Sequence, residues 1–217
     1  FSAASNVTGI ISDYKKIYVM MKRYGATVAF DAASFSSHDN LDADYFDALF
    51  LSPHKLLGGV GSCGLLAIKK ELVKSEKPTF AAGGTVSYVS RSSHFFAPSV
   101  ERMEEGGTQH VMGLIRAALA YRLRNEVGLD VIKSREDELT KQFCEGLDKL
   151  PEVVSYFPRG VPRLPIFAFN VKGVSPYDFA EALSEDYGVQ TRAGCACAGP
   201  YGHDLLGLKD DQKFDQK

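Results

Sequence analysis

The stretch DALFLSPHKLLGGVG at residues 47–61 decides the fold that we expect for this chain. It begins as a strand-sized apolar run and ends in glycines, and Lys55 stands where the run ends. A lysine beside a hydroxyl, an imidazole and glycine backbone is expected of an amine that binds a phosphorylated aldehyde cofactor covalently. The alternative is a solvated lysine at a strand end, the commonest environment of lysines.

The residues on either side predict an α/β layer. Asp13 is placed to cap a helix that continues to about Arg23, and an apolar run from Thr27 ends at Asp31. A further strand is expected at residues 64–70, and a polar loop without periodicity at residues 90–105. We therefore expect the α/β class, with a mostly parallel sheet sandwiched by helices.

The second part of the chain changes character. Spacing predicts two long helices, from residue 109 to about 126 and from about 130 to 150, separated by Gly128. Shorter strands and a helix capped at Ser175 follow Pro151. We expect a large domain at residues 1–127 and a smaller α+β domain at residues 128–217. The helical pattern of the first long helix consists of Val111, Leu114, Ile115, Ala118, Leu119 and Arg122.

Composition favours a small-molecule ligand. The chain has 25 basic and 27 acidic residues with no basic run, which argues against nucleic acid and anionic membranes as partners. Its apolar stretches are too short to span a bilayer. Four cysteines in 217 residues do not form a disulfide framework, so a reducing compartment, the cytoplasm, is expected.

Both ends of the chain suggest a piece of a longer protein. It begins at Phe1 rather than at methionine, and it ends in a charged tail, residues 209–217, without a packing pattern.

Four residues other than Lys55 are candidates for binding the same cofactor. Because parallel strands bind ligands at their carboxyl ends, Asp31 and Lys55 are expected to face one crevice, where a carboxylate can keep a pyridine nitrogen protonated. Asp31 could instead cap the following turn. Ser52 and His54 can donate to phosphate oxygens. Thr108, after Gly106 and Gly107, is expected to form an anion site at a helix N-terminus, although a plain helix cap explains it as well.

The glycines at residues 59–64 match the dinucleotide-binding spacing formally. We reject that interpretation, because a strand rather than a helix is expected to follow them.

The stretch RAGCACAGP at residues 192–200 allows three interpretations. Cys195 or Cys197 could be a nucleophile whose thiolate is favoured by Arg192. Cys195, Cys197 and His203 could hold a metal, which is the weakest interpretation because a fourth ligand is not evident. The small residues could also simply fill a tight loop.

Taken together and in this order, SNVTG at residues 5–9, Asp31, SPHK at residues 52–55, EGGT at residues 105–108 and RAGCACA at residues 192–198 resemble class V, fold-type I pyridoxal-phosphate enzymes, above all the cysteine desulfurase and selenocysteine lyase branch. The resemblance covers nearly the whole chain. It implies a lyase that removes sulfur or selenium from L-cysteine or L-selenocysteine, leaving alanine and an enzyme persulfide.

The resemblance also implies a role for each motif residue. Lys55 would form the Schiff base, Asp31 would pair with the pyridine nitrogen, and Ser52 and His54 would hold the phosphate. Thr108 would reach the phosphate of a neighbouring subunit, which implies a homodimer. Catalytic Cys197 would take the sulfur and pass it to an acceptor protein. Asn6 would lie near the substrate or the cofactor's phenolic oxygen, and Arg192, in the cysteine loop, would also meet the substrate.

The chain also departs from the family pattern. Ser34 stands where desulfurases commonly have a glutamine on the cofactor oxygen, so that this hydrogen bond would be shortened or lost. The stacking histidine would lie before Phe1, and the carboxylate-binding arginine after Lys217. A class V transaminase or epimerase, a molybdenum-cofactor sulfurase, and a noncatalytic interaction domain remain alternatives.

Overall fold

The computed structural model describes residues 1–209, and the charged tail predicted beyond Lys209 lies outside them. Its contacts divide the chain into two compact units. Unit 1 consists of Phe1 and residues 13–128, and unit 2 consists of residues 2–12 together with the segment from Leu129 onward. The predicted domain boundary is close to this division, but residues 2–12 belong with the second unit.

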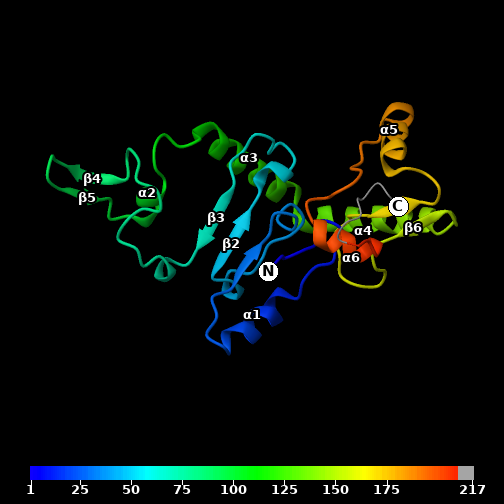
Figure 1. Cartoon of the computed structure of the whole chain (residues 1–217), viewed down its shortest axis with the longest axis horizontal. Helices are drawn as coiled ribbons and strands as arrows, with labels where there is room; N and C mark the ends of the chain where they lie inside the picture. Colours follow the sequence, from blue (N-terminus) through cyan, green and yellow to red (C-terminus); the bar gives the residue numbers. More distant parts are fainter. Residues whose placement is uncertain (210–217) are drawn as a thin grey trace. The chain divides into compact units, whose positions relative to one another are not determined.

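Among residues 1–209, unit 1 carries a three-stranded sheet, a two-stranded sheet and three α-helices, and unit 2 carries a two-stranded sheet and three α-helices, most of which Figure 1 labels. The elements of unit 1 are α1 (Tyr14–Lys22), β1 (Ala29–Asp31), η1 (Ala43–Tyr45), β2 (Ala48–Leu51), η2 (Pro53–Lys55), β3 (Leu65–Ile68), η3 (Lys70–Leu72), β4 (Val86–Val89), β5 (His94–Phe96), α2 (Val100–Glu104) and α3 (Val111–Val127). Those of unit 2 are α4 (Leu129–Leu147), β6 (Val153–Ser155), β7 (Phe169–Val171), α5 (Pro176–Tyr187) and α6 (Gly199–Leu206).

The central sheet has the order β1-β2-β3. β1 and β2 are parallel, with Asp31 opposite Phe50, whereas β3 is antiparallel to β2 and lies beside it (Figure 1). Val28 and Phe30 are fully buried. The α/β class predicted from the sequence is confirmed, and the predicted third strand runs antiparallel because its connection from η2 is a short glycine turn rather than a crossover.

Helix α1 begins where the sequence predicts, because the Asp13 carboxylate accepts from Lys16 N at 3.1 Å. The spacing of Ile17, Met20, Met21 and Tyr24 places them on one face of this helix, but a residue outside that set contacts the sheet. Tyr14 lies edge-on to Phe30, with the ring centroids 6.1 Å apart, and Met20 is 45% exposed. Tyrosine suits this position because it combines an apolar ring with a polar tip.

The structure confirms the predicted helix α3, which buries the face opposite to its row of large apolar residues. Gly113, Ala117, Ala120 and Arg124 are buried, whereas the apolar residues of the sequence pattern are exposed. Arg124 reaches the segment after β1, where it donates to the Ser36 carbonyl and to Asn40 Oδ1. Small residues on a helix face let the backbone of another segment pack closely against it. A search for large apolar residues does not identify such a face.

Residues 90–105 are more ordered than the predicted loop. β4 and β5 form an antiparallel hairpin, whose turn is closed by Ser93 N donating to Ser90 Oγ at 3.0 Å, and α2 follows with Ser99 as its cap. Serine hydroxyls form such turns locally, without any hydrophobic period.

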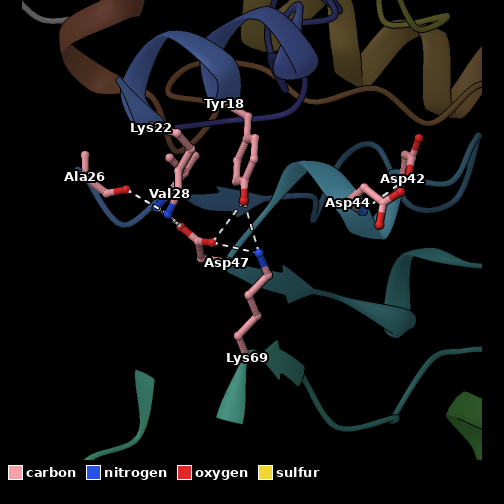
Figure 2. Close-up of polar contacts among 8 residues, drawn as sticks. All are labelled: Tyr18, Lys22, Ala26, Val28, Asp42, Asp44, Asp47 and Lys69. Atoms are coloured by element: carbon pink, nitrogen blue, oxygen red, sulfur yellow. Dashed lines mark hydrogen bonds and ion pairs between the residues drawn. The ribbon is translucent and has the colours of Figure 1, made fainter. Parts of the chain in front are cut away.

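A buried carboxylate ties four segments of unit 1 together (Figure 2). Asp47 accepts from Lys22 Nζ at 2.8 Å, Lys69 Nζ at 2.9 Å and Val28 N at 2.8 Å, and its side chain is 4% exposed. Tyr18 Oη lies 3.3 Å from the same carboxylate. Burial by itself raises the pKa of Asp47, but these hydrogen bonds outweigh it and hold the pKa well below its usual range.

The turn that carries Lys55 is closed by a backbone contact. In η2, Leu56 N donates to the carbonyl of the buried Pro53 at 3.0 Å, and the chain then folds back over that carbonyl. A Cβ at Gly59 would lie 1.9 Å from Pro53 O, so only glycine fits.

We predict that Gly59→Ala destabilises unit 1 by about 1–3 kcal/mol, because its methyl group overlaps the Pro53 carbonyl. Gly64→Ala is the matched control, since its Cβ would lie 3.8 Å from the Leu51 carbonyl, at ordinary contact distance. Urea unfolding measures both variants, and equal midpoints would contradict the assignment.

Asp47→Asn is expected to destabilise unit 1 by about 1–3 kcal/mol, because the buried Val28 N–H and two partly exposed lysine ammonium groups lose their carboxylate partner. Because the folded-state pKa is depressed, the Asp47 contribution is present above the unfolded pKa, about 4, and is lost as pH falls below it toward the folded pKa. Urea unfolding from pH 7 to pH 3 should therefore show a smaller acid-induced loss in the variant than in the wild type.

Asp42→Asn is the control for this series. Asp42 pairs with Lys15 at 2.9 Å, and both side chains are substantially exposed, 39% and 49%. Its replacement should change stability little. If Asp47→Asn and Asp42→Asn had the same free energy of unfolding at neutral pH, the buried carboxylate would not stabilise unit 1 more than the exposed one does.

Candidate functional site

The parallel pairing of β1 and β2 brings two predicted site residues to one edge of the sheet. Asp31 is the last residue of β1, and Ser52 directly follows β2. Asp31 is exposed, and its Oδ1 accepts from Ala33 N at 2.8 Å. One carboxylate oxygen thus caps the turn, as the alternative interpretation proposed, while Oδ2 has no hydrogen-bond partner among residues 1–209.

Lys55 lies at the same edge and reaches toward the segment after Asp31. Its Nζ is 3.5 Å from Ser34 Oγ, three residues beyond the aspartate. The Lys55 side chain is exposed, as is that of His54, so the described residues do not provide a desolvated amine. Both side chains belong to η2, which follows the carboxyl end of β2 after Ser52. The contact with Ser34 places the amine beside the loop that begins at Asp31.

Helix α3 holds the glycine turn after Lys55 through contacts that sequence reasoning missed. Arg116 Nη1 donates to Val60 O at 2.7 Å, and the His110 ring lies 3.2 Å from Gly61 O. Both partners are backbone carbonyls, which carry no side-chain signature, so nothing in the sequence indicated these contacts.

The anion site predicted at Thr108 is not formed as expected. Helix α3 begins at Val111, so Thr108 is three residues before the helix and is exposed. Gly107, at φ +80°, instead bonds to the Gly83 carbonyl through its N–H, at 2.7 Å. His110 occupies the cap position of this helix and makes no side-chain cap hydrogen bond.

In unit 2, the residues 192–198, here called the cysteine loop, hold a thiol beside a guanidinium. Arg192 Nη2 donates to Cys197 Sγ at 3.2 Å, and both side chains are exposed. Cys197 has φ 57°, and it alone among the non-glycine residues described has a positive φ. A left-handed cysteine is strained, and such strain often marks functional sites.

Asn6, predicted to meet the substrate, contacts this loop. Its Nδ2 donates to Ala196 O at 2.6 Å. Asn6 and Arg192 also line a cavity of about 370 Å³ whose other walls come largely from apolar residues of β7, α5 and α6. The structure therefore brings Asn6, Arg192 and the Cys197 loop together within one unit.

The metal interpretation of Cys195, Cys197 and His203 gains no support. Within residues 1–209, no three histidine, cysteine or carboxylate side chains are grouped so as to hold a metal ion. The glycines at residues 59–64 form a turn leading into β3, which confirms the rejection of the dinucleotide-binding pattern. No helix in the described part of the chain has the length and apolar character of a membrane span.

Comparison with known proteins places this geometry in a family. Residues 1–209 match the model of the aminotransferase class-V family. A probable cysteine desulfurase of Pyrococcus abyssi is 33% identical over 199 residues, covering 90% of this chain and 49% of the relative. Probable cysteine desulfurase 2 of Mycobacterium leprae is 32% identical over 205 residues, covering 92% and 48%. The chain thus spans about half the length of the curated relatives it matches.

Solved structures give the same result. The apo structure of the cysteine desulfurase from Thermococcus onnurineus NA1 superposes with a TM-score of 0.86 at 32% identity, covering 96% of this chain and 52% of that one. The cysteine desulfurase CsdA of Escherichia coli gives 0.85 at 28% identity, covering 95% and 51%. The family is dependent on pyridoxal phosphate. With its parallel strand ends, its lysine turn and a sequence match over residues 1–209, this chain belongs to the aminotransferase class-V family.

Proposed function

We propose that this chain is the part of a pyridoxal-phosphate-dependent cysteine desulfurase that carries the cofactor lysine and the sulfur-accepting thiol. The substrate is L-cysteine or L-selenocysteine, and the products are alanine and a persulfide on Cys197. The observation that carries the proposal is the Arg192–Cys197 contact, 3.2 Å long, in a chain similar to cysteine desulfurases. A strained, exposed thiol beside a cation suits nucleophilic attack on sulfur.

The edge of unit 1 fits pyridoxal phosphate by the chemistry of its side chains. It offers an amine at Lys55, a carboxylate oxygen of Asp31 without a protein partner among residues 1–209, and the hydroxyl and imidazole of Ser52 and His54. When bound, the cofactor supplies an electron-withdrawing ring that stabilises negative charge at the substrate α-carbon.

Each residue then has a defined task. Lys55 Nζ would hold the cofactor covalently and its amine would move a proton, and Asp31 would keep the ring nitrogen protonated. Ser34 is close enough to Lys55 to orient its amine. Ser52, His54 and the partner copy's threonine equivalent to Thr108 bind the phosphate.

In the proposed sulfur transfer, one bond forms and one bond breaks. The Cys197 thiolate attacks the substrate sulfur, a sulfur–sulfur bond forms, and the carbon–sulfur bond breaks. Its electron pair remains with the carbon skeleton, which takes up a proton on the way to alanine. The terminal sulfur then passes to an acceptor, for which we propose a protein thiol. Asn6 and Arg192, which line one cavity, are proposed to meet the substrate.

We further propose a cytoplasmic homodimer. The support for the compartment is that all four cysteines are free, and two of them, Cys195 and Cys197, are exposed. The support for the dimer is that Thr108 is exposed on unit 1, where a second copy could use it.

Pyridoxal phosphate added to this chain should give a near-visible absorbance band that requires Lys55. Borohydride reduction would make the attachment permanent, and mass spectrometry of tryptic peptides should place it at Lys55. Lys55→Ala is expected to abolish the band, because no other amine lies in the lysine turn, residues 52–61.

Lys70→Ala is the matched control for this experiment. The Lys70 side chain is 78% exposed, so its replacement tests nonspecific attachment to surface amines. Equal labelling of Lys55 and Lys70 in the wild type would argue for a noncatalytic descendant of the family.

Cys197→Ala should reduce persulfide formation from L-cysteine by more than about a hundredfold, because it removes the nucleophile. Cys195→Ala is the control, since Cys195 is an exposed thiol in the same loop. Persulfide is measured by alkylation and mass spectrometry. Transamination that persists in Cys197→Ala, with no persulfide in the wild type, would indicate a class V transaminase instead.

A further inference from the structure

Residues 5–9, here called the Ser5 turn, form a rigid support inside unit 2. Ser5 Oγ accepts from Val7 N at 3.2 Å and from Thr8 N at 3.1 Å, and Gly9 N donates to Ser5 O at 3.0 Å. Thr8 is 1% exposed, and a Cβ at Gly9 would lie 2.6 Å from the Leu164 carbonyl. A turn fixed in this way presents the next side chain, Asn6, in a defined direction.

Two side-chain contacts from this turn flank Cys197. On one side, Asn6 Nδ2 donates to Ala196 O at 2.6 Å, immediately before the cysteine. On the other side, Tyr201 of α6 lies with its hydroxyl 3.4 Å from Thr8 Oγ1. The amide bond is the shorter contact and the one adjacent to the thiol.

The cysteine loop needs such support because its conformation is strained. Cys197 has φ 57°, and Gly194 has φ 73° with its α-carbon so close to Tyr177 that an added Cβ would lie 2.4 Å from the hydroxyl. A non-glycine residue stays in the left-handed region only where its surroundings hold it there. The hydrogen bond from Asn6, in the Ser5 turn, to the Ala196 carbonyl can hold the adjacent Cys197 in this conformation.

We propose that Asn6 is a positioning residue that holds the cysteine loop through the Ala196 carbonyl and so keeps Cys197 against Arg192. The inference rests on the proposed function, because it concerns how Cys197 is positioned for that reaction. The carboxamide has two N–H groups, so this bond leaves one N–H for the predicted contact with substrate.

The first experiment measures how firmly the loop is held, by native-state trypsin cleavage after the exposed Arg192. Loss of one hydrogen bond in Asn6→Ala should accelerate that cleavage about five- to tenfold. Asn6→Asp keeps the shape but replaces the donor with a carboxylate, which repels the Ala196 carbonyl, so it should act in the same direction. Cleavage after Lys149, which is exposed in the turn that follows α4, is the internal reference.

The second experiment measures whether Cys197 stays beside Arg192. A nearby guanidinium attracts anionic iodoacetate over neutral iodoacetamide by about three- to fivefold. After the reaction, the tryptic peptide from Ala193 to Lys209 contains both Cys195 and Cys197, so Cys195 serves as the comparison within one peptide. The preference at Cys197 should fall toward that at Cys195 in both Asn6 variants.

Asn170→Ala is the matched control. Asn170 lines the same cavity, but its Nδ2 donates to Tyr156 Oη at 3.4 Å rather than to the loop. It should leave the cleavage after Arg192 and the reagent preference at wild-type values.

Two results would overturn the inference. One is a wild-type cleavage rate and reagent preference in both Asn6 variants. The other is an equal acceleration after Lys149 and Arg192, which would mean general loosening of unit 2. Neither readout uses the cofactor, so a chain that fails to bind pyridoxal phosphate at Lys55 would still test the Asn6 contact.

Discussion

The buried carboxylate of Asp47 is the constraint on which the arrangement of unit 1 depends. Parallel strands have no tight hairpin to set their register, so another interaction must do so. Asp47 bonds to the N–H of Val28 with its side chain, and its own N–H donates to the Val28 carbonyl at 2.8 Å. These bonds fix β2 against β1, and the lysines at the carboxylate add α1 and the end of β3 (Figure 2).

The register has a direct consequence for the candidate site. With Asp31 opposite Phe50, β1 and β2 end at the same level, so that Asp31 and Ser52 share one edge. A slip of one residue would turn every side chain of the strand to the other face. The glycine turn then returns over Pro53, which sets the position of Lys55 relative to that edge. The buried carboxylate of Asp47 and the close approach of the glycine turn to Pro53 thus determine where the candidate site residues lie.

The conformation of the cysteine loop is stabilised in a different way. It has no sheet register to define it, and it relies on a few specific contacts: the guanidinium at the sulfur, the asparagine at a carbonyl, and a tyrosine under a glycine. A loop held by so few bonds depends strongly on each of them.

The sequence by itself determined the family, the α/β class and the candidate catalytic and binding residues. Motif residues such as Lys55, Asp31 and Cys197 are recognisable by type and spacing. It also predicted α1 from its aspartate cap and rejected a dinucleotide site from the strand after the glycines. These signals are local. Only the tertiary structure decided the buried face of α3, the antiparallel direction of β3, the hairpin at β4 and β5, and the partners of Asn6 and Asp47. Those features depend on backbone carbonyls, close approach of small residues and contacts between segments distant in sequence, none of which leaves a periodic mark along the chain.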